Sequence, residues 1–406
     1  MNRALKIALI IFGVAILIFG GALLLKKDDI KRLAAVNTMF DADKIVDNFS
    51  HMDRGFLTHL LDVPLADDWG VETAAIPDTV NIAGTERPLE DVLAELDTTA
   101  LVIIRDGKII HEKYDLGTGP DDRRISWSVA KSFMSGLYGK ALADGDIASL
   151  DDEVTTYVPD LKGTAYEGAS LRNILNMSSG IRYNEDYLDQ SSDINKMGRT
   201  IALGGSLDKY TTSLTERQFE PGSDWQYVSM DTHVAAWALR NATGRTLHDL
   251  WQETYGPLGF RQQPYYLVDG KDAAFALGGL NLTTRDYAKF GQLFLQNGEW
   301  KGQQLIPADW IAQSTVHSAP AMSDRGVGYG YQWWVPMPAA QDYFAVGIYG
   351  QYIYVDPKTN IVIAKNAADR EFMFADEVGT HSMNKNIEMM RSLAAQLGAT
   401  DEQPTP

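Results

Sequence analysis

The chain has 406 residues, of which 45% are hydrophobic, enough to bury a substantial core in one large domain or two interleaved ones. Its 36 Lys and Arg residues stand against 54 Asp and Glu residues, and the net charge of -18 argues against nucleic acid as a partner, because nucleic-acid binding requires a basic surface. Cysteine is absent, which excludes disulfides, thiolate metal sites and a cysteine nucleophile.

An apolar run over residues 7–25 follows a short tail, 1–6, and matches the roughly 20 residues that cross a bilayer core. No Ala-x-Ala-like cleavage site follows the run, so we expect an uncleaved transmembrane anchor, with the membrane as a partner. Large C-terminal domains translocate largely regardless of local charge, so we expect an extracytoplasmic, periplasmic catalytic domain. Residues 26–70 are then expected to form a juxtamembrane helix and connector.

Strands are predicted near both ends of a globular region, residues 71–395. Apolar runs on both sides of Asp106-Gly107 predict one hairpin, and a second hairpin is predicted over residues 352–364. Helical periodicity dominates the region between them. The predicted helices cover residues 129–143, 171–177, 231–242, 284–297 and 384–397. The fold class is therefore α+β, with an antiparallel sheet built from both ends of the chain around a mostly helical insertion, and residues 396–406 form a disordered tail.

Ser128-Val-Ala-Lys131 matches S-x-x-K, a pattern in which the serine is a nucleophile and the lysine accepts its proton. The pattern alone has little specificity, and residues 206–209 and 382–385 also match it. Ser128 opens an amphipathic segment and is predicted at a buried helix start, whereas helix capping explains the other two serines.

A helix start suits this chemistry for physical reasons. Ser128 and Lys131 share one face at i and i+3, and the backbone NH groups at the helix N-terminus can stabilise a developing oxyanion. A lysine in such a pocket loses solvation, so its pKa falls and it can act as a base. The simpler alternative is an N-cap serine beside a solvated lysine.

Further segments of the chain help to decide whether Ser128 is a nucleophile or an N-cap residue. They are residues 171–180, 278–286, 305–310 and 328–333. With these and the S-x-x-K pattern, residues from about 70 to 395 resemble the β-lactamase-related serine hydrolases, whose relatives include class C β-lactamases, D,D-peptidases and esterases. Within that group the chain most resembles the 6-aminohexanoate-dimer hydrolase branch. The resemblance implies a β-lactamase/transpeptidase-like fold and an acyl-enzyme mechanism that needs no cofactor.

The resemblance also assigns roles to other residues. Tyr227-Val-Ser229 resembles the Tyr-x-Asn or Tyr-x-Ser element, which implies that Tyr227 relays a proton to the leaving group and that Ser229 contacts the substrate. Tyr187 resembles a loop tyrosine that touches the substrate amide. A buried structural tyrosine and an ordinary loop aromatic are the alternatives.

The third family element, Lys-Thr-Gly or His-Thr-Gly, corresponds here to Ala345-Val-Gly347-Ile348-Tyr-Gly350-Gln351. Without the cationic residue, recognition of the carboxylate that penicillins and peptidoglycan stems carry is weakened. The resemblance implies that the backbone NH groups of Ser128 and Ile348 form the oxyanion hole and that Gly347 borders the substrate. An ordinary strand kinked at glycine is the alternative.

Other chemistries lack support in the sequence. The seven histidines are scattered without close ligand spacing, so no metal site is expected and each histidine is expected to be structural or exposed. The Gly-x-Ser-x-Gly pattern and both nucleotide-binding glycine motifs are absent.

The sequence therefore predicts a serine hydrolase that cleaves a small amide or ester through a Ser128 acyl-enzyme, with Lys131 as base and Tyr227 as proton relay. A cell-wall D,D-peptidase and a promiscuous esterase or β-lactamase are alternatives that share the nucleophile. A catalytically inactive scaffold or sensor that keeps the fold is an alternative of another class.

Overall fold

The computed structural model describes residues 27–66, 69–320, 326–337, 341–374 and 381–399. Within these ranges no helix is both long enough and apolar enough to span a bilayer. The apolar run 7–25 and the tail residues 400–406 lie outside the described residues. The last helix runs to Ala399, so the prediction of disorder from residue 396 is wrong for residues 396–399.

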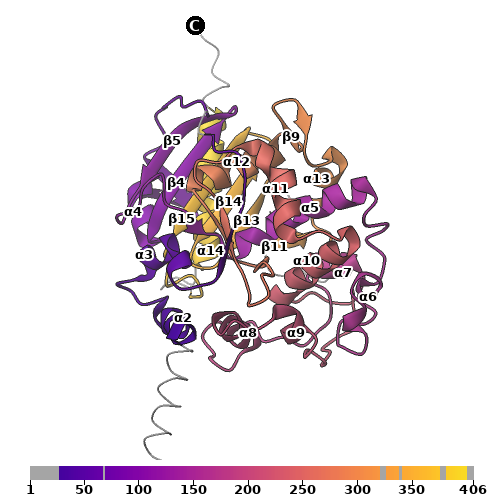
Figure 1. Ribbon diagram of the computed structural model, residues 1–406. Coiled ribbons are helices and arrows are strands. Elements are labelled where there is room, and N and C mark those ends of the chain that lie inside the picture. The colour runs from indigo at the N-terminus through magenta and orange to yellow at the C-terminus, as the bar shows by residue number, and fades with distance from the viewer. Residues whose placement is uncertain (1–26, 67–68, 321–325, 338–340, 375–380, 400–406) are drawn as a thin grey trace, which may run out of the picture.

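A seven-stranded antiparallel sheet forms the centre of one half of the molecule (Figure 1). The predicted hairpins supply four neighbouring strands, the last of which is an edge strand of the sheet, and at the first turn both Asp106 and Gly107 have positive φ, as a type I′ hairpin loop requires. The early and late parts of the chain thus lie side by side in one sheet, as expected. In spatial order the strands are β11 (Val327–Gly330), β12 (Trp333–Pro336), β13 (Tyr343–Gly347), β14 (Gln351–Asp356), β15 (Ile361–Ala367), β4 (Thr98–Arg105) and β5 (Lys108–Tyr114).

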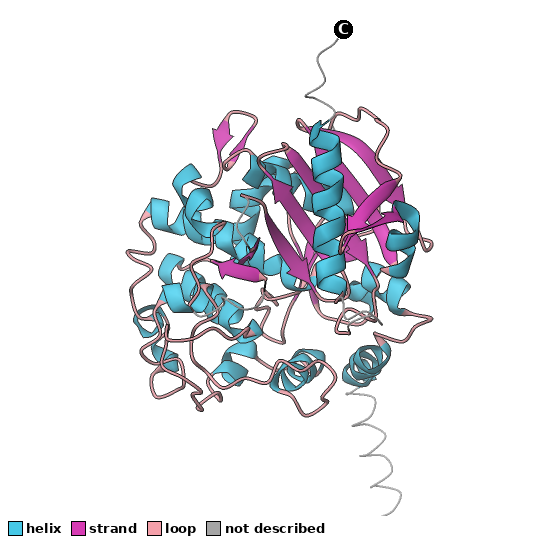
Figure 2. Ribbon diagram, turned by 180° about the vertical axis from the view of Figure 1, so that it is seen from behind, coloured by secondary structure: helices cyan, strands magenta, loops and turns pink. Residues whose placement is uncertain are grey.

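Both faces of this sheet are covered by helices. Helix α14 (Ser382–Ala399) crosses one face (Figure 2), where it packs with α4 (Leu89–Glu95) on Leu101 and Ile103. Helices α5 (Ala130–Asp144) and α12 (Thr284–Leu295) cover the opposite face. Because side chains alternate along a strand, Val102 and Ile104 join the larger core on that second side.

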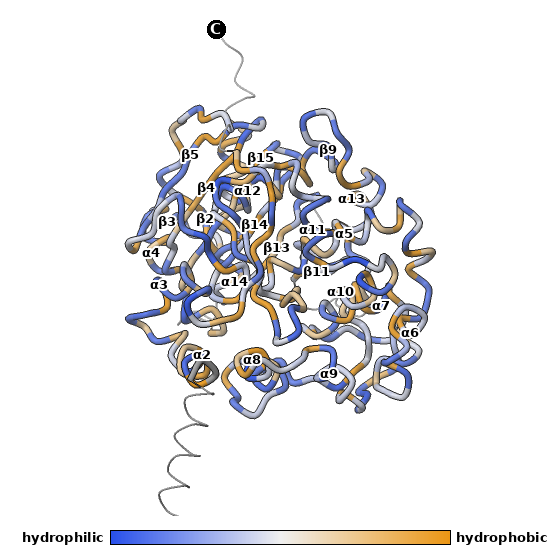
Figure 3. Tube along the Cα trace, in the orientation of Figure 1, coloured by the Kyte–Doolittle hydropathy of each residue, from blue (hydrophilic) through white to orange (hydrophobic). Residues whose placement is uncertain are grey.

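The other half of the molecule is mostly helical, as the periodicity predicted. Its helices pack around α5 and α10 and bury a continuous apolar core, and Figure 3 shows polar positions along the peripheral loops. The helices are α6 (Val154–Tyr157), α7 (Leu171–Leu175), α8 (Asp193–Ala202), α9 (Leu207–Thr211), α10 (Ser229–Thr243), α11 (Leu247–Tyr255) and α13 (Ala308–Ser314).

Residues 27–66, here called the N-terminal strap, were expected to form a juxtamembrane helix and connector. They do contain helices, α2 (Lys27–Thr38) and α3 (Ile45–Ser50), but from Met39 onward the strap also supplies buried core residues. Strand β1 (Thr58–Leu60) pairs with β7 at the edge of a second sheet, whose order is β1-β7-β8-β6. The strap is thus part of the folded domain.

The remaining strands complete the second sheet and form two small hairpins. They are β6 (Arg124–Ile125), β7 (Tyr265–Leu267), β8 (Leu280–Leu282), the pair β2 (Thr79–Ile82) and β3 (Thr85–Pro88), and the pair β9 (Glu299–Trp300) and β10 (Gln303–Gln304).

Candidate active site

Ser128 lies in a short 3₁₀ turn, Trp127–Val129, that joins β6 to the start of α5. The φ angle of Trp127 is 44°, a conformation that is strained for a bulky residue and that persists only where the surrounding structure fixes it. This sharp turn leaves Ser128 partly exposed while its neighbours Trp127 and Val129 are buried. The sequence correctly predicted the nucleophile candidate at a buried helix start.

Lys131 is 2% exposed, and its ammonium group has three hydrogen-bond acceptors. Its Nζ lies 2.8 Å from Ser128 Oγ, 3.2 Å from Ser229 Oγ and 2.8 Å from the carbonyl oxygen of Leu277. Burial lowers the pKa of Lys131 to about 7, while the acidic groups of Glu185 and Asp231 raise it by a smaller amount. At neutral pH a large fraction of Lys131 is therefore a neutral amine that can accept the Ser128 proton.

Glu185 is a half-buried acidic group that was not singled out from the sequence. The backbone NH of Ser229 donates to its carboxylate at 2.9 Å, the Ser229 hydroxyl donates to it as well, and the Tyr187 hydroxyl donates at 2.8 Å. Burial raises the pKa of Glu185, and the nearby Lys131 lowers it. A continuous hydrogen-bonded chain thus links Ser128, Lys131, Ser229, Glu185 and Tyr187.

Tyr227 lies next to Ser128 and Lys131. Its hydroxyl interacts with the Ser128 side chain, its ring centroid is 5.1 Å from Lys131 Nζ, and its ring stacks on Trp334 at 5.7 Å. Burial raises the pKa of Tyr227 above its usual value, so the phenol stays protonated at neutral pH. The group is therefore suited to donate a proton rather than to accept one.

The end of β13 passes directly beside the nucleophile turn. A Cβ atom on Gly347 would lie 2.4 Å from the carbonyl oxygen of Ser126 and 3.2 Å from the amide nitrogen of Ser128, so only glycine fits there. Ile348 follows at the tip of the turn into β14. The side chain of Gln351 fixes this turn by donating to the carbonyl oxygens of Tyr349 at 2.9 Å and Ala367 at 2.8 Å.

A cavity of about 390 Å³ opens next to Ser128, and its lining includes Tyr187, Ser229 and Ile348. The walls are mainly apolar, and Arg199 is the only charged side chain among the described residues that line them. Four of the predicted site residues, Ser128, Tyr187, Ser229 and Ile348, therefore line one cavity although they come from distant parts of the chain. The other three, Lys131, Tyr227 and Gly347, lie next to Ser128 or its turn but do not line the cavity. The aromatic residues Trp127 and Tyr349 also line the cavity, whereas Trp334 stacks on Tyr227 and does not.

Comparison with known proteins agrees with this geometry. Residues 89–381 match the beta-lactamase family model. Over 291 residues the chain is 32% identical to 6-aminohexanoate-dimer hydrolase of Paenarthrobacter ureafaciens, which covers 68% of this chain and 74% of that protein. The chain belongs to the beta-lactamase family. It is a serine hydrolase that acts on amides or esters, as the sequence predicted.

Solved structures of more distant proteins share the fold. A Bacillus anthracis protein assigned as a 6-aminohexanoate-dimer hydrolase superposes with a TM-score of 0.77 at 23% identity, covering 90% of this chain and 97% of its own. A family VIII carboxylesterase superposes with a TM-score of 0.56 at 15% identity, covering 75% and 96%. The predicted β-lactamase-type α+β fold is thereby confirmed.

The N-terminal strap contributes to the cleft of this beta-lactamase-family chain, which the sequence reasoning did not foresee. Phe40 of the strap stacks on Tyr349 with ring centroids 4.7 Å apart and also contacts Trp127. Helix α2 packs against α8, and both the strap and α8 line the cavity. The apolar wall residues of these two segments are Val36, Met39, Phe40, Met52 and Phe56 of the strap and Ile194, Met197 and Ile201 of α8.

The two other S-x-x-K serines have structural roles in this beta-lactamase-family fold. Ser206 caps α9, where its hydroxyl accepts a hydrogen bond from the amide of Lys209. Ser382 donates to the buried carboxylate of Asp369 at the start of α14, and Lys385 pairs with Glu95. Capping was the correct explanation for Ser206, whereas the hydroxyl of Ser382 donates to Asp369 rather than accepting from a backbone amide of α14, so capping does not explain Ser382.

Proposed function

We propose that the chain hydrolyses small linear amides or esters with an apolar acyl part through an acyl-enzyme on Ser128. The observation that carries the proposal is the contact of 2.8 Å between Ser128 Oγ and Nζ of the buried Lys131. Because burial brings the pKa of Lys131 to about 7, the amine can take the serine proton without a histidine.

The chemistry follows from the positions of the groups. Ser128 Oγ attacks the carbonyl carbon as its proton passes to Lys131, and the backbone NH groups of Ser128 and Ile348 stabilise the oxyanion. Collapse of the tetrahedral intermediate breaks the bond to the leaving group, which takes a proton from Tyr227. Tyr227 regains a proton from Lys131, and a water molecule activated by the neutral amine then cleaves the ester on Ser128. The products are a carboxylic acid and an amine or alcohol.

The cavity favours a substrate that is extended and largely apolar. Its volume of about 390 Å³ suits one small molecule, and its walls offer methionine, isoleucine and phenylalanine side chains. Tyr187 and Ser229 border the position of the scissile group, where they contact the substrate amide. A linear oligomer of an ω-amino acid, as in the name of the Paenarthrobacter relative, fits this description.

Cleavage of penicillins or of D-Ala-terminated peptides fits less well. Both substrates carry a carboxylate next to the reacting group, and the segment Ala345–Gln351 offers no cationic side chain there. Arg199 is the only cation on the cavity wall within the described residues, and it belongs to α8 rather than to β13. Ester cleavage remains compatible with the same site because the alcohol leaves more easily than an amine.

We also propose that residues 7–25 anchor the chain in a membrane with the catalytic domain outside the cytoplasm. The support is the length and apolarity of that run and its position directly before α2, the first helix of the N-terminal strap that borders the cleft. Extraction of membranes at alkaline pH should leave the chain in the pellet, and protease added to intact spheroplasts should degrade the catalytic domain. Release into the soluble fraction would contradict the anchor.

The nucleophile is tested by labelling the full chain, in mild detergent, with a fluorophosphonate probe and locating the label by mass spectrometry. We expect the label on Ser128 and none in Ser128→Ala, with strongly slowed labelling in Lys131→Met. Ser206→Ala is the matched control because Ser206 opens a second S-x-x-K segment, and its labelling should equal that of wild type. Full hydrolytic activity in Ser128→Ala would overturn the proposal, and an unlabelled wild-type chain would favour an inactive scaffold.

A further inference from the structure

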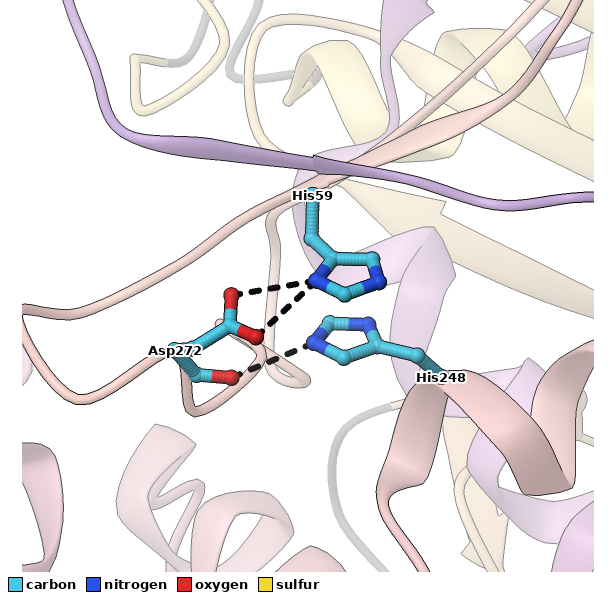
Figure 4. A group of neighbouring side chains, drawn as sticks. All are labelled: His59, His248 and Asp272. Carbon is cyan, nitrogen blue, oxygen red and sulfur yellow. Dashed lines mark hydrogen bonds and ion pairs between the residues drawn. The ribbon is translucent and has the colours of Figure 1, made fainter.

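Two histidines that are far apart in the sequence meet at the surface, away from Ser128. His59 lies on the edge strand β1 of the N-terminal strap and His248 lies in the first turn of α11, while Asp272 belongs to the turn that follows β7 (Figure 4). The spacing of the histidines in the sequence predicted no metal site, with each histidine structural or exposed. In the structure, two of them lie next to the same aspartate.

The three side chains present their donor atoms to one another. The imidazole rings are parallel, with an interplanar angle of 4° and centroids 3.8 Å apart. His59 Nδ1 is 3.0 and 3.1 Å from the two carboxylate oxygens of Asp272, and His248 Nε2 is 3.2 Å from the carbonyl oxygen of the same residue. One ligand atom from each residue lies within 4.8 Å of the other two.

The turn that carries Asp272 is held in place before any ligand arrives. The buried carboxylate of Asp269 accepts hydrogen bonds from the amides of Lys271, Ala273 and Leu207. Asp272 itself has a φ of 62°, a left-handed conformation that aspartate tolerates better than most residues. The fixed turn points both the carboxylate and the carbonyl of Asp272 toward the histidines, as Figure 4 shows.

We propose that His59, His248 and Asp272 bind one divalent transition-metal ion of the Zn²⁺ type. Two imidazole nitrogens and one carboxylate oxygen are a donor set that suits Zn²⁺, Ni²⁺ and Cu²⁺ and leaves a fourth position for water. His248 is 2% exposed, and burial favours the neutral form of an imidazole, which is the form that binds a metal ion.

Binding requires a small local change. An ion between two parallel rings lies outside both ring planes, so the rings must tilt toward it about their Cβ–Cγ bonds. The side chain of His59 is 36% exposed at a sheet edge, where solvent borders the ring. Nδ1 of His248 has no hydrogen-bond partner among the described residues. A ligating histidine whose second ring nitrogen is not hydrogen-bonded is held less firmly, so we expect the affinity for the metal ion to be about 10- to 100-fold below that of a site with such a bond, in the micromolar range.

The bound ion would join the strap to the catalytic domain. His59 is in the strap, which supplies Phe40, Met52 and Phe56 to the cavity wall, whereas His248 and Asp272 are in the domain body. The backbone of Leu57, two residues before His59, also accepts a hydrogen bond from Val268. A metal ion therefore stabilises the position of the strap at the cleft without touching the reacting groups.

The test is a titration of the metal-free full chain, in detergent and without a histidine tag, with ZnCl₂ in a calorimeter. We expect one equivalent to bind, with a rise in melting temperature. His59→Gln and Asp272→Asn should each weaken binding by about tenfold or more. Both variants should fold, because His59 is partly exposed and asparagine tolerates the left-handed φ of Asp272. Titration with CoCl₂ should give the visible bands of a low-symmetry site, and these should be lost in the variants.

The matched control is His51→Gln. His51 also lies 3.0 Å from an aspartate, Asp47, and is similarly exposed, but no second histidine joins that pair in the metal-ligating groups found among the described residues. Its Zn²⁺ binding should equal that of wild type. Absence of Zn²⁺ binding in the wild-type chain would overturn the proposal, as would binding that survives both His59→Gln and Asp272→Asn or that falls equally in His51→Gln. None of these outcomes depends on Ser128 being the nucleophile.

Discussion

Replacing Glu185 by glutamine should move the acid limb of the pH–activity profile to lower pH. In the wild type Lys131 has a pKa of about 7, and only its neutral form can accept the Ser128 proton. Below pH 7 the amine is protonated, so kcat/KM should fall about tenfold for each further pH unit. The negative charge of Glu185 favours the ammonium form of Lys131, and its removal therefore lowers the pKa of the lysine.

The size of this effect follows from the hydrogen-bonded chain. Ser229 Oγ bridges the two groups, at 3.2 Å from Lys131 Nζ and in contact with the Glu185 carboxylate. A separation of ~5.5 Å at an effective dielectric constant of ~20 corresponds to about 3 kcal/mol. Since one pH unit corresponds to about 1.4 kcal/mol, the acid limb should move by up to about two pH units.

The assay is the hydrolysis of a chromogenic short-chain ester, followed as kcat/KM from pH 5 to 9 at constant ionic strength. Glutamine keeps an oxygen for the Ser229 amide, and its NH₂ group can donate to the Ser229 hydroxyl, so the fold should survive. Glu216→Gln serves as control, because Glu216 is exposed and paired with Arg182, and its profile should match wild type. An unchanged acid limb in Glu185→Gln, or one moved to higher pH, would refute the reasoning.

Three further predictions concern the cleft. Gly347→Ala should reduce activity at least ~100-fold and destabilise the fold by about 1–3 kcal/mol, because its Cβ would overlap the Ser126 carbonyl. Gly119→Ala is the control, because Gly119 has open space around it and does not line the cavity, so the kinetics should be unchanged and the melting temperature kept or raised. Tyr227→Phe should lower kcat for amides by about 10²-fold and for activated esters far less, since only the amine needs protonation; equal losses would contradict the relay. Phe40→Ala should raise KM for substrates with long acyl chains more than for acetyl esters, and an equal effect on both would show that the strap does not contact the acyl group.

Local patterns in the sequence were enough to predict a candidate nucleophile and much of the secondary structure. The Ser128–Lys131 spacing places both groups on one helix face wherever that helix lies, and the Asp106-Gly107 hairpin depends only on its own turn and the flanking apolar runs. The membrane anchor and the periplasmic location also come from local composition, and they stay predictions because residues 7–25 lie outside the described residues.

Contacts between distant segments determine the features of the site that local patterns could not predict. Lys131 is a usable base because Leu277 and Ser229 enclose it, and these partners are 146 and 98 residues away in the chain. Glu185, the strap wall and the His59–His248 pair likewise depend on which segments the fold brings together. The sequence could name the chemically capable residues because side-chain chemistry is local. Only the tertiary structure could say which were desolvated or paired, because burial and electrostatic interaction depend on neighbours that sequence spacing does not specify.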